Sequence, residues 1–254
     1  MKHDMKILSR TLLLLHAFAL IFALIGRLFV INMIHSQGAN MLRTTYMLMF
    51  FFIIVVVATA TQIIIGVHFY KSLFSTQGYL TWTLPVTANQ HLLSKLLTAF
   101  LWNILDFALL AIAAILFYGS FSDLVNVVIE SFQYMETAWL PLIANTVLFF
   151  VLATLSSILT LYMSATIGQL FTNHRIIASI ATYGIFTVIA QFVYTMVLFS
   201  TAQNSYIMDV STAISPSTTL YFRIMLIVNT ISFIQVVLFY VVIHYLTRRK
   251  LNLA

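Results

Sequence analysis

The sequence predicts an all-α integral membrane protein with six transmembrane helices, an N-terminal interfacial helix and both termini in the cytoplasm. Hydrophobic residues make up 62% of its 254 residues and charged residues only 7%, and its mean hydropathy is +1.03. Soluble domains carry several times more charge. The apolar runs are long and unbroken, which favours helices of about 20 residues over the alternating strands of a barrel. We expect a single transmembrane domain over residues 1–254.

The elements are expected in the following order. Residues 1–10 place Lys2, Lys6 and Arg10 on one helical face, which predicts a short helix on the inner membrane surface. A polar segment at residues 200–219 contains a Ser-Pro-Ser run, which predicts a break between the last two spans. The expected spans are residues 11–31, 41–70, 91–118, 139–170, 176–199 and 220–246.

The basic residues near the span ends predict the orientation. One side carries Lys2, Lys6, Arg10, Lys71, Lys95, Arg175, Arg248, Arg249 and Lys250, and the other carries only Arg27, Arg43 and Arg223. Because basic residues concentrate in cytoplasmic loops, both termini are expected to be cytoplasmic. The net charge of +6 is then an orientation signal and an attraction to anionic lipid in the bilayer, with no nucleic-acid partner expected.

Most chemistries are excluded by residue type. The chain has no cysteine, no HExxH and no GxSxG, so it lacks thiolate sites and two common hydrolytic motifs. It also has no GxxxxGK[ST], the loop that cradles nucleotide phosphates. Its seven histidines include no pair four residues apart, so no metal site is expected. We predict no catalytic residues, no metal and no cofactor bound by this chain.

Asp106 is the most informative single residue. It lies eleven residues beyond Lys95, which places it about 16 Å into the third span. An acid at that depth costs about 2.5–3.5 kcal/mol, so it should face the protein interior or a wet cavity. Asn103 and Asp106 could line a substrate path or relay a proton, or Asp106 could simply join helices by hydrogen bonds. Nothing basic is expected at this depth, so Asp106 is either protonated or bonded by Asn103 and by hydroxyls such as Ser156, Ser157 or Thr160.

Small residues recur along the fourth span. Ser157, Thr160, Ser164 and Gly168 lie on one helical face. Small side chains at this spacing let another helix approach closely, which predicts a helix-packing or subunit interface.

The longest polar interruption expected on the cytoplasmic side is residues 69–97. It has a turn signal at Leu84-Pro85, and Thr87 followed by Gln90 has the spacing of a capping box that restarts a helix. Its aromatic residues suit either a buried protein interface or a helix at the level of the lipid headgroups.

Within this interruption, residues 78–97 read GYLTWTLPVTANQHLLSKLL. This stretch resembles the cytoplasmic segment between the second and third spans of bacterial type-two ATP-binding-cassette transporter permeases. Trp82 and Ala88-Asn89 depart from the family pattern, which puts the detailed fit to a partner in question. The matching positions are Gly78, Tyr79, Leu80, Thr81, Leu84, Pro85, Val86, Leu93, Ser94, Lys95 and Leu96.

The resemblance implies a multi-pass subunit of the bacterial cytoplasmic membrane that pairs with a second permease subunit, identical or homologous. A separate cytoplasmic ATPase subunit would hold ATP and Mg. Residues 71–90 would then be the coupling segment, contacting that ATPase through Phe74, Gly78, Tyr79, Leu80, Trp82, Leu84 and Pro85.

The function expected from these observations is export of an amphiphilic substrate, such as a drug, a lipid-like molecule or an antimicrobial peptide. One alternative is a proton-coupled secondary transporter that uses Asp106 as its relay, although the sequence shows no strong internal repeat. Another is a membrane scaffold or sensor that transports nothing. An intramembrane enzyme ranks last because no catalytic set is present.

Overall fold

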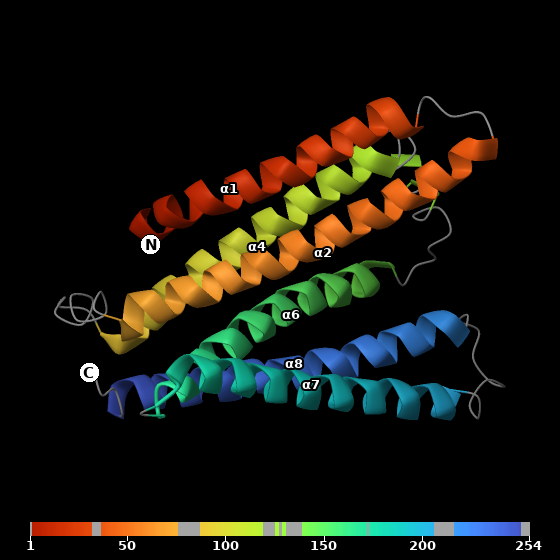
Figure 1. Ribbon diagram of the computed structural model, residues 1–254. Coiled ribbons are helices and arrows are strands. Elements are labelled where there is room, and N and C mark those ends of the chain that lie inside the picture. The colour runs from red at the N-terminus through yellow and green to blue at the C-terminus, as the bar shows by residue number, and fades with distance from the viewer. Residues whose placement is uncertain are drawn as a thin grey trace. The chain divides into compact units, whose positions relative to one another are not determined.

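The computed structural model describes residues 2–31, 37–75, 87–118, 125–126, 129–130, 139–171, 173–205 and 216–249. Every regular element among these residues is a helix (Figure 1). Six helices in the described part of the chain are long and apolar enough to cross a membrane. The elements are α1 (Lys2–Ile25), the π-helical turn η1 (Gly26–Ile31), α2 (Gln37–Phe74), α4 (Ala88–Tyr118), α6 (Trp139–Gly168), α7 (Arg175–Ser205) and α8 (Pro216–Arg249).

The six helices lie where the spans were predicted, and most of them extend a few residues beyond the predicted bounds. Helix α7 continues to Ser205 and α8 begins at Pro216, so both ends of the polar segment 200–219 are helical. Proline suits the first position of a helix because the missing amide hydrogen has no partner there. The middle of that segment, residues 206–215, lies outside the described residues.

Helix α1 is continuous from Lys2 to Ile25. No break separates residues 2–10 from the first span. Whether residues 1–10 lie on the membrane surface stays a prediction. The turn η1 follows at Gly26, where a Cβ atom would come within 2.2 Å of the Tyr46 ring. A larger residue at this position would collide with the rings of Tyr46 and Phe117.

The capping box at Thr87 is confirmed. The Thr87 amide donates to Gln90 Oε1 at 3.1 Å, and the Gln90 amide donates to Thr87 Oγ1 at 3.4 Å. These bonds satisfy two amides that a helix start leaves unpaired. Helix α4 therefore begins where the sequence predicts.

The chain forms two compact units. The first unit contains Met1–His68 and Leu97–Glu136, and the second contains Phe69–Leu96 and Thr137–Ala254. The divisions fall within α2 and α4, so each of these helices contributes to both units.

The core of the first unit is a stack of aromatic rings from α1, α2 and α4. Phe22 stacks on Tyr46 with ring centroids 4.5 Å apart, and Phe117 stacks on Tyr46 at 5.7 Å and on Phe50 at 4.2 Å. The Tyr46 hydroxyl also donates to the Phe22 carbonyl at 2.8 Å. The stack joins the three helices by large apolar contacts and one partly buried hydrogen bond.

Helix α6 is the centre of the second unit, where it packs against both α7 and α8. Polar pairs join α6 to α8: Thr146 and Tyr221 hydroxyls lie 2.8 Å apart, and Asn229 Nδ2 donates to Asn145 Oδ1 at 2.5 Å. Helix α7 differs, because none of its residues 175–201 is buried. One side of α7 is thus free to contact lipid or a partner.

Candidate functional site

A polar cluster lies inside the first unit, and Asp106 is at its centre. His16 Nε2 of α1 lies 2.5 Å from Asp106 Oδ1 of α4, and the side chains of His16 and Asp106 are 2% and 6% exposed. The Thr61 hydroxyl of α2 lies 2.9 Å from the same oxygen. Two helices, α1 and α2, therefore supply polar groups to one carboxyl oxygen of a third, α4. We call His16, Thr61, Gln62, Asn103 and Asp106 the Asp106 cluster.

The proton count of the His16–Asp106 pair follows from its hydrogen bonds. His16 Nδ1 lies 2.7 Å from the Leu12 carbonyl oxygen, and a carbonyl can only accept, so Nδ1 carries a hydrogen. The short contact from Nε2 to Asp106 then needs one further proton between the two atoms. Whether that proton sits on nitrogen or oxygen, the pair as a whole is neutral.

This arrangement corrects two expectations. We expected nothing basic at the depth of Asp106, which was wrong, because His16 lies there. We also expected Asp106 to be protonated or to be bonded by Asn103 and by hydroxyls of a facing helix, such as Ser156, Ser157 or Thr160. A hydroxyl of a facing helix does contact Asp106, but it belongs to Thr61 of α2 and not to those residues of α6. A histidine is a suitable partner since it can neutralise a buried acid while sharing a proton with it.

A signal for His16 was present in the sequence. His16 lies ten residues beyond Lys6, and Asp106 lies eleven residues beyond Lys95. At 1.5 Å per helical residue, both side chains stand about 15–16 Å from a predicted inner-side lysine. Equal depth in two different spans is therefore the signal in the sequence that points to a contact between His16 and Asp106.

Asn103 lies one turn before Asp106 on the same face of α4 and belongs to the same cluster. Its Nδ2 donates to the Ala99 carbonyl at 2.9 Å, and Gln62 Nε2 of α2 donates to its Oδ1. Asn103 and Asp106, the candidate substrate pathway, are thus both buried in helix contacts. A second histidine–carboxylate pair joins α1 to α2, with His68 Nε2 3.0 Å from Asp4 Oδ1.

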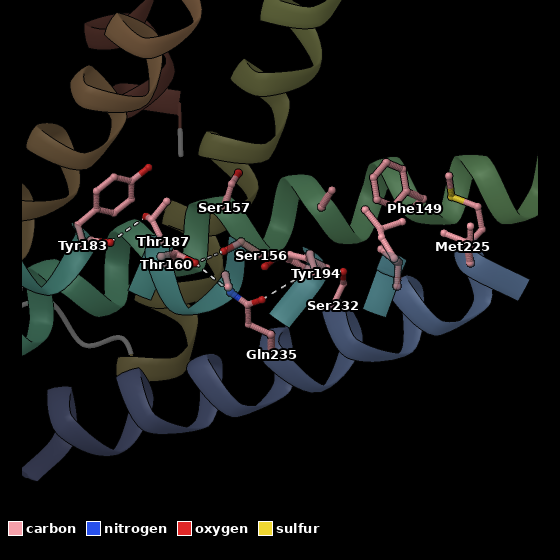
Figure 2. Close-up of a pocket in the computed structure, with 15 residues that line it drawn as sticks. Phe149, Ser156, Ser157, Thr160, Tyr183, Thr187, Tyr194, Met225, Ser232 and Gln235 are labelled. Atoms are coloured by element: carbon pink, nitrogen blue, oxygen red, sulfur yellow. Dashed lines mark hydrogen bonds between the residues drawn. The ribbon is translucent and has the colours of Figure 1, made fainter. Parts of the chain in front are cut away.

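The second unit contains a pocket of about 470 Å³ between α6, α7 and α8 (Figure 2). Its wall is largely apolar, and four polar residues on three helices form a hydrogen-bonded chain within it. Tyr194 Oη lies 3.0 Å from Ser232 Oγ and donates to Gln235 Oε1 at 3.5 Å, while Gln235 Nε2 donates to Thr160 Oγ1 at 3.2 Å. The pocket therefore combines a hydrocarbon wall with one polar strip.

The predicted small-residue face of α6 divides between this pocket and the contact with α7. Ser157 and Thr160 line the pocket, and Ser164 is buried. At Gly168 an added Cβ would lie 1.9 Å from Ser179 Oγ and 2.8 Å from the Arg175 carbonyl oxygen. The backbones of α6 and α7 thus meet closely at Gly168.

Of the predicted ATPase-coupling residues, the structure describes only Phe74. It is buried, and its ring meets Phe69 edge to face with centroids 5.8 Å apart. The others lie outside the described residues: Gly78, Tyr79, Leu80, Trp82, Leu84 and Pro85.

Sequence reasoning did not anticipate the role of Tyr162. Its ring stacks on Phe69 at 3.6 Å, and its hydroxyl donates to the Lys95 carbonyl at 3.1 Å. Phe69 is near the end of α2 and Lys95 near the start of α4, so Tyr162 of α6 holds both flanks of the segment 76–86.

Among the described residues, no group of three or more histidine, aspartate or glutamate side chains is placed to hold a metal ion. Comparisons with protein-family models, with curated proteins and with solved structures find no match for this chain.

Proposed function

We propose that this chain is the membrane-spanning permease subunit of an ATP-driven ABC transporter, exporting an amphiphilic substrate and powered by a separate ATPase subunit. The ATPase would bind ATP and Mg, and a second permease subunit would complete the transporter in a bacterial cytoplasmic membrane. The resemblance of residues 78–97 to the coupling segment of such permeases is the sequence basis for this proposal.

The observation that supports it best is the position of Tyr162. A chain without a nucleotide-binding loop can use ATP only if a partner's movement reaches its spans mechanically. Tyr162 joins both flanks of residues 76–86 to α6, and α6 also supplies Ser156 and Thr160 to the pocket. A push on the segment would therefore be transmitted to the pocket wall through one buried side chain.

The test is co-purification of the full chain from its native membrane in mild detergent, followed by mass spectrometry. Wild type should retain a nucleotide-binding ATPase in stoichiometric amount, and the Tyr79→Ala/Trp82→Ala double variant should lose it. The control is Phe192→Ala/Phe199→Ala, which removes two exposed rings from α7 and should retain the ATPase. Absence of an ATPase from wild type, in a preparation that preserves other complexes, would overturn the proposal.

The His16–Asp106 pair favours a second candidate, a proton-coupled secondary transporter. A buried neutral pair that shares one proton could release and regain it during a transport cycle. This candidate predicts transport driven by a pH gradient in vesicles that contain the purified chain alone. Asp106→Asn should abolish that transport, whereas an ATP-driven permease should show none to begin with.

A further inference from the structure

The α6–α8 pocket has a chemistry that limits what it can bind. None of the described residues that line it is charged. A charged group entering an apolar site without a partner costs several kcal/mol or more. Ions and charged headgroups are therefore poor ligands, and the volume of about 470 Å³ falls within the range of small-molecule sites.

The polar strip defines what the ligand must carry. Gln235 uses one amide hydrogen on Thr160 and accepts one bond from Tyr194. An amide has two hydrogens and two lone pairs, so one donor and one acceptor site remain on Gln235. A hydroxyl or an amide group can satisfy both sites at once, because each can donate and accept.

The rim of the pocket carries hydrogen-bond acceptors, and the pocket is open at the side of the helix bundle. Ser157 and Thr187 are exposed, and both donate to carbonyls of their own helices, at 2.9 Å and 2.8 Å. Each hydroxyl oxygen therefore keeps lone pairs that can accept a hydrogen bond from a ligand. Ser157 lies about 16 Å from the Gly168 end of α6, and Thr187 lies about 18 Å from the Arg175 end of α7. Both residues are therefore near the middle of their helices. An opening at that depth faces hydrocarbon, so a ligand would enter sideways from the bilayer.

We infer that the α6–α8 pocket binds a small uncharged amphiphile with a hydroxyl or amide head, and that Gln235 recognises that head. The hydrocarbon body would lie against Phe149, Ile224 and Val228, which line the pocket. Calling this ligand the transported substrate rests on the proposed function. The binding itself does not, because it needs neither an ATPase nor ATP.

The test uses the purified full chain in lipid nanodiscs and three photoreactive probes with the same 12-carbon, diazirine-bearing chain. The heads are a hydroxyl, a sulfonate and a trimethylammonium group. After illumination, mass spectrometry maps the labelled peptides. The hydroxyl probe should label pocket peptides of α6, α7 and α8 at least about tenfold more than either charged probe, because tenfold corresponds to about 1.4 kcal/mol, the upper range of a neutral hydrogen bond.

Two variants and two matched controls test the site itself. Gln235→Leu removes the polar head contact, and Ala153→Phe fills the pocket; each should reduce labelling by the hydroxyl probe about tenfold. Gln191→Leu and Ala181→Phe make the same changes at exposed positions of α7 and should leave it unchanged.

Two results would overturn the inference. Equal labelling by all three probes would mean that the pocket is only a groove filled by lipid chains. Cross-linking of one chain to a second at the same peptides, with no labelling by the hydroxyl probe, would mean that a permease copy covers it. Since no ATPase is present, either result leaves the co-purification test of the proposed function unaffected.

Discussion

At the scale of single residues, the cost of placing Asp106 deep in a span is offset by His16. A lone carboxylate would have to be protonated or reach water, whereas a histidine that already donates through Nδ1 can share one proton with it. Thr61 adds a third helix to the same oxygen. The pair therefore joins α1 to α4 by one short buried hydrogen bond, and its strength lies in the dependence of each buried partner on the other.

His16→Leu should reveal that strength. Removing one partner of a buried pair leaves the other uncompensated, which costs about 3–5 kcal/mol. Ordinary hydrogen bonds between membrane helices average only about 0.6 kcal/mol. We expect the free energy of unfolding, measured by steric trapping in bicelles, to fall by about 3 kcal/mol.

The control for His16→Leu is Gln191→Leu, a polar-to-leucine change on the exposed face of α7, which should change stability little. The double variant His16→Leu/Asp106→Leu should be much less destabilised than the sum of the single variants, because no unpaired group remains. If His16→Leu lowers the free energy of unfolding by less than about 1 kcal/mol, the interaction between His16 and Asp106 is not a strong one.

At the scale of helices, close approach depends on where glycine stands. Gly168 faces the backbone of α7, where the Arg175 carbonyl oxygen would lie 2.8 Å from an added Cβ. A backbone oxygen cannot rotate away as a side chain can, so the helices would have to separate. Gly184 of α7 is the opposite case, with no atom within 4 Å of an added Cβ.

These two glycines form a matched pair for the same substitution. Gly168→Ala should destabilise the protein by about 1–3 kcal/mol through overpacking. Gly184→Ala should stabilise it by up to about 1 kcal/mol, because alanine favours a helix interior. Thermal melting of the detergent-solubilised chain should therefore shift in opposite directions. If both variants shift the melting temperature in the same direction, the protein does not have the close contact of α6 with α7 that the structure shows at Gly168.

The helices could be predicted from the sequence, but their pairing could not. Hydrophobic length predicts a span directly, and cap residues such as Thr87 and Gln90 mark its start. In a bilayer, however, lipid-facing and partner-facing sides are equally apolar, so periodicity does not show which face packs. The partners of Asp106 and the anchoring role of Tyr162 depend on that packing. The pocket was not predicted for the same reason, although Ser157 and Thr160 were identified as special positions.

At the scale of the whole molecule, the two units differ in chemistry. The first holds the Asp106 cluster, in which His16, Thr61, Asn103 and Asp106 are buried and hydrogen-bonded, and Gln62 is partly buried and donates to Asn103. The second holds the pocket, in which a polar strip keeps hydrogen-bonding capacity beside an open rim. A buried cluster held together by hydrogen bonds between helices suits stability or proton exchange, and a polar strip beside an opening suits ligand binding. ATP-driven export and proton-coupled transport therefore predict different effects of mutations in the first unit and in the second unit.

The permease proposal depends on orientation, which the absence of cysteine makes easy to test. A single introduced cysteine is the only thiol in the chain. Residue 77 lies in the segment predicted to be cytoplasmic, and residue 122 in the loop predicted to be outside, because basic residues gather on the side of Lys71 and Lys95. In spheroplasts, a membrane-impermeant maleimide should label Ser122→Cys and should reach Gln77→Cys only after permeabilisation. In inside-out vesicles the pattern should reverse, and wild type should stay unlabelled throughout. Labelling of Gln77→Cys in intact spheroplasts would place the segment outside, where no cytoplasmic ATPase could contact it, and the permease proposal would then fail whatever the pocket binds.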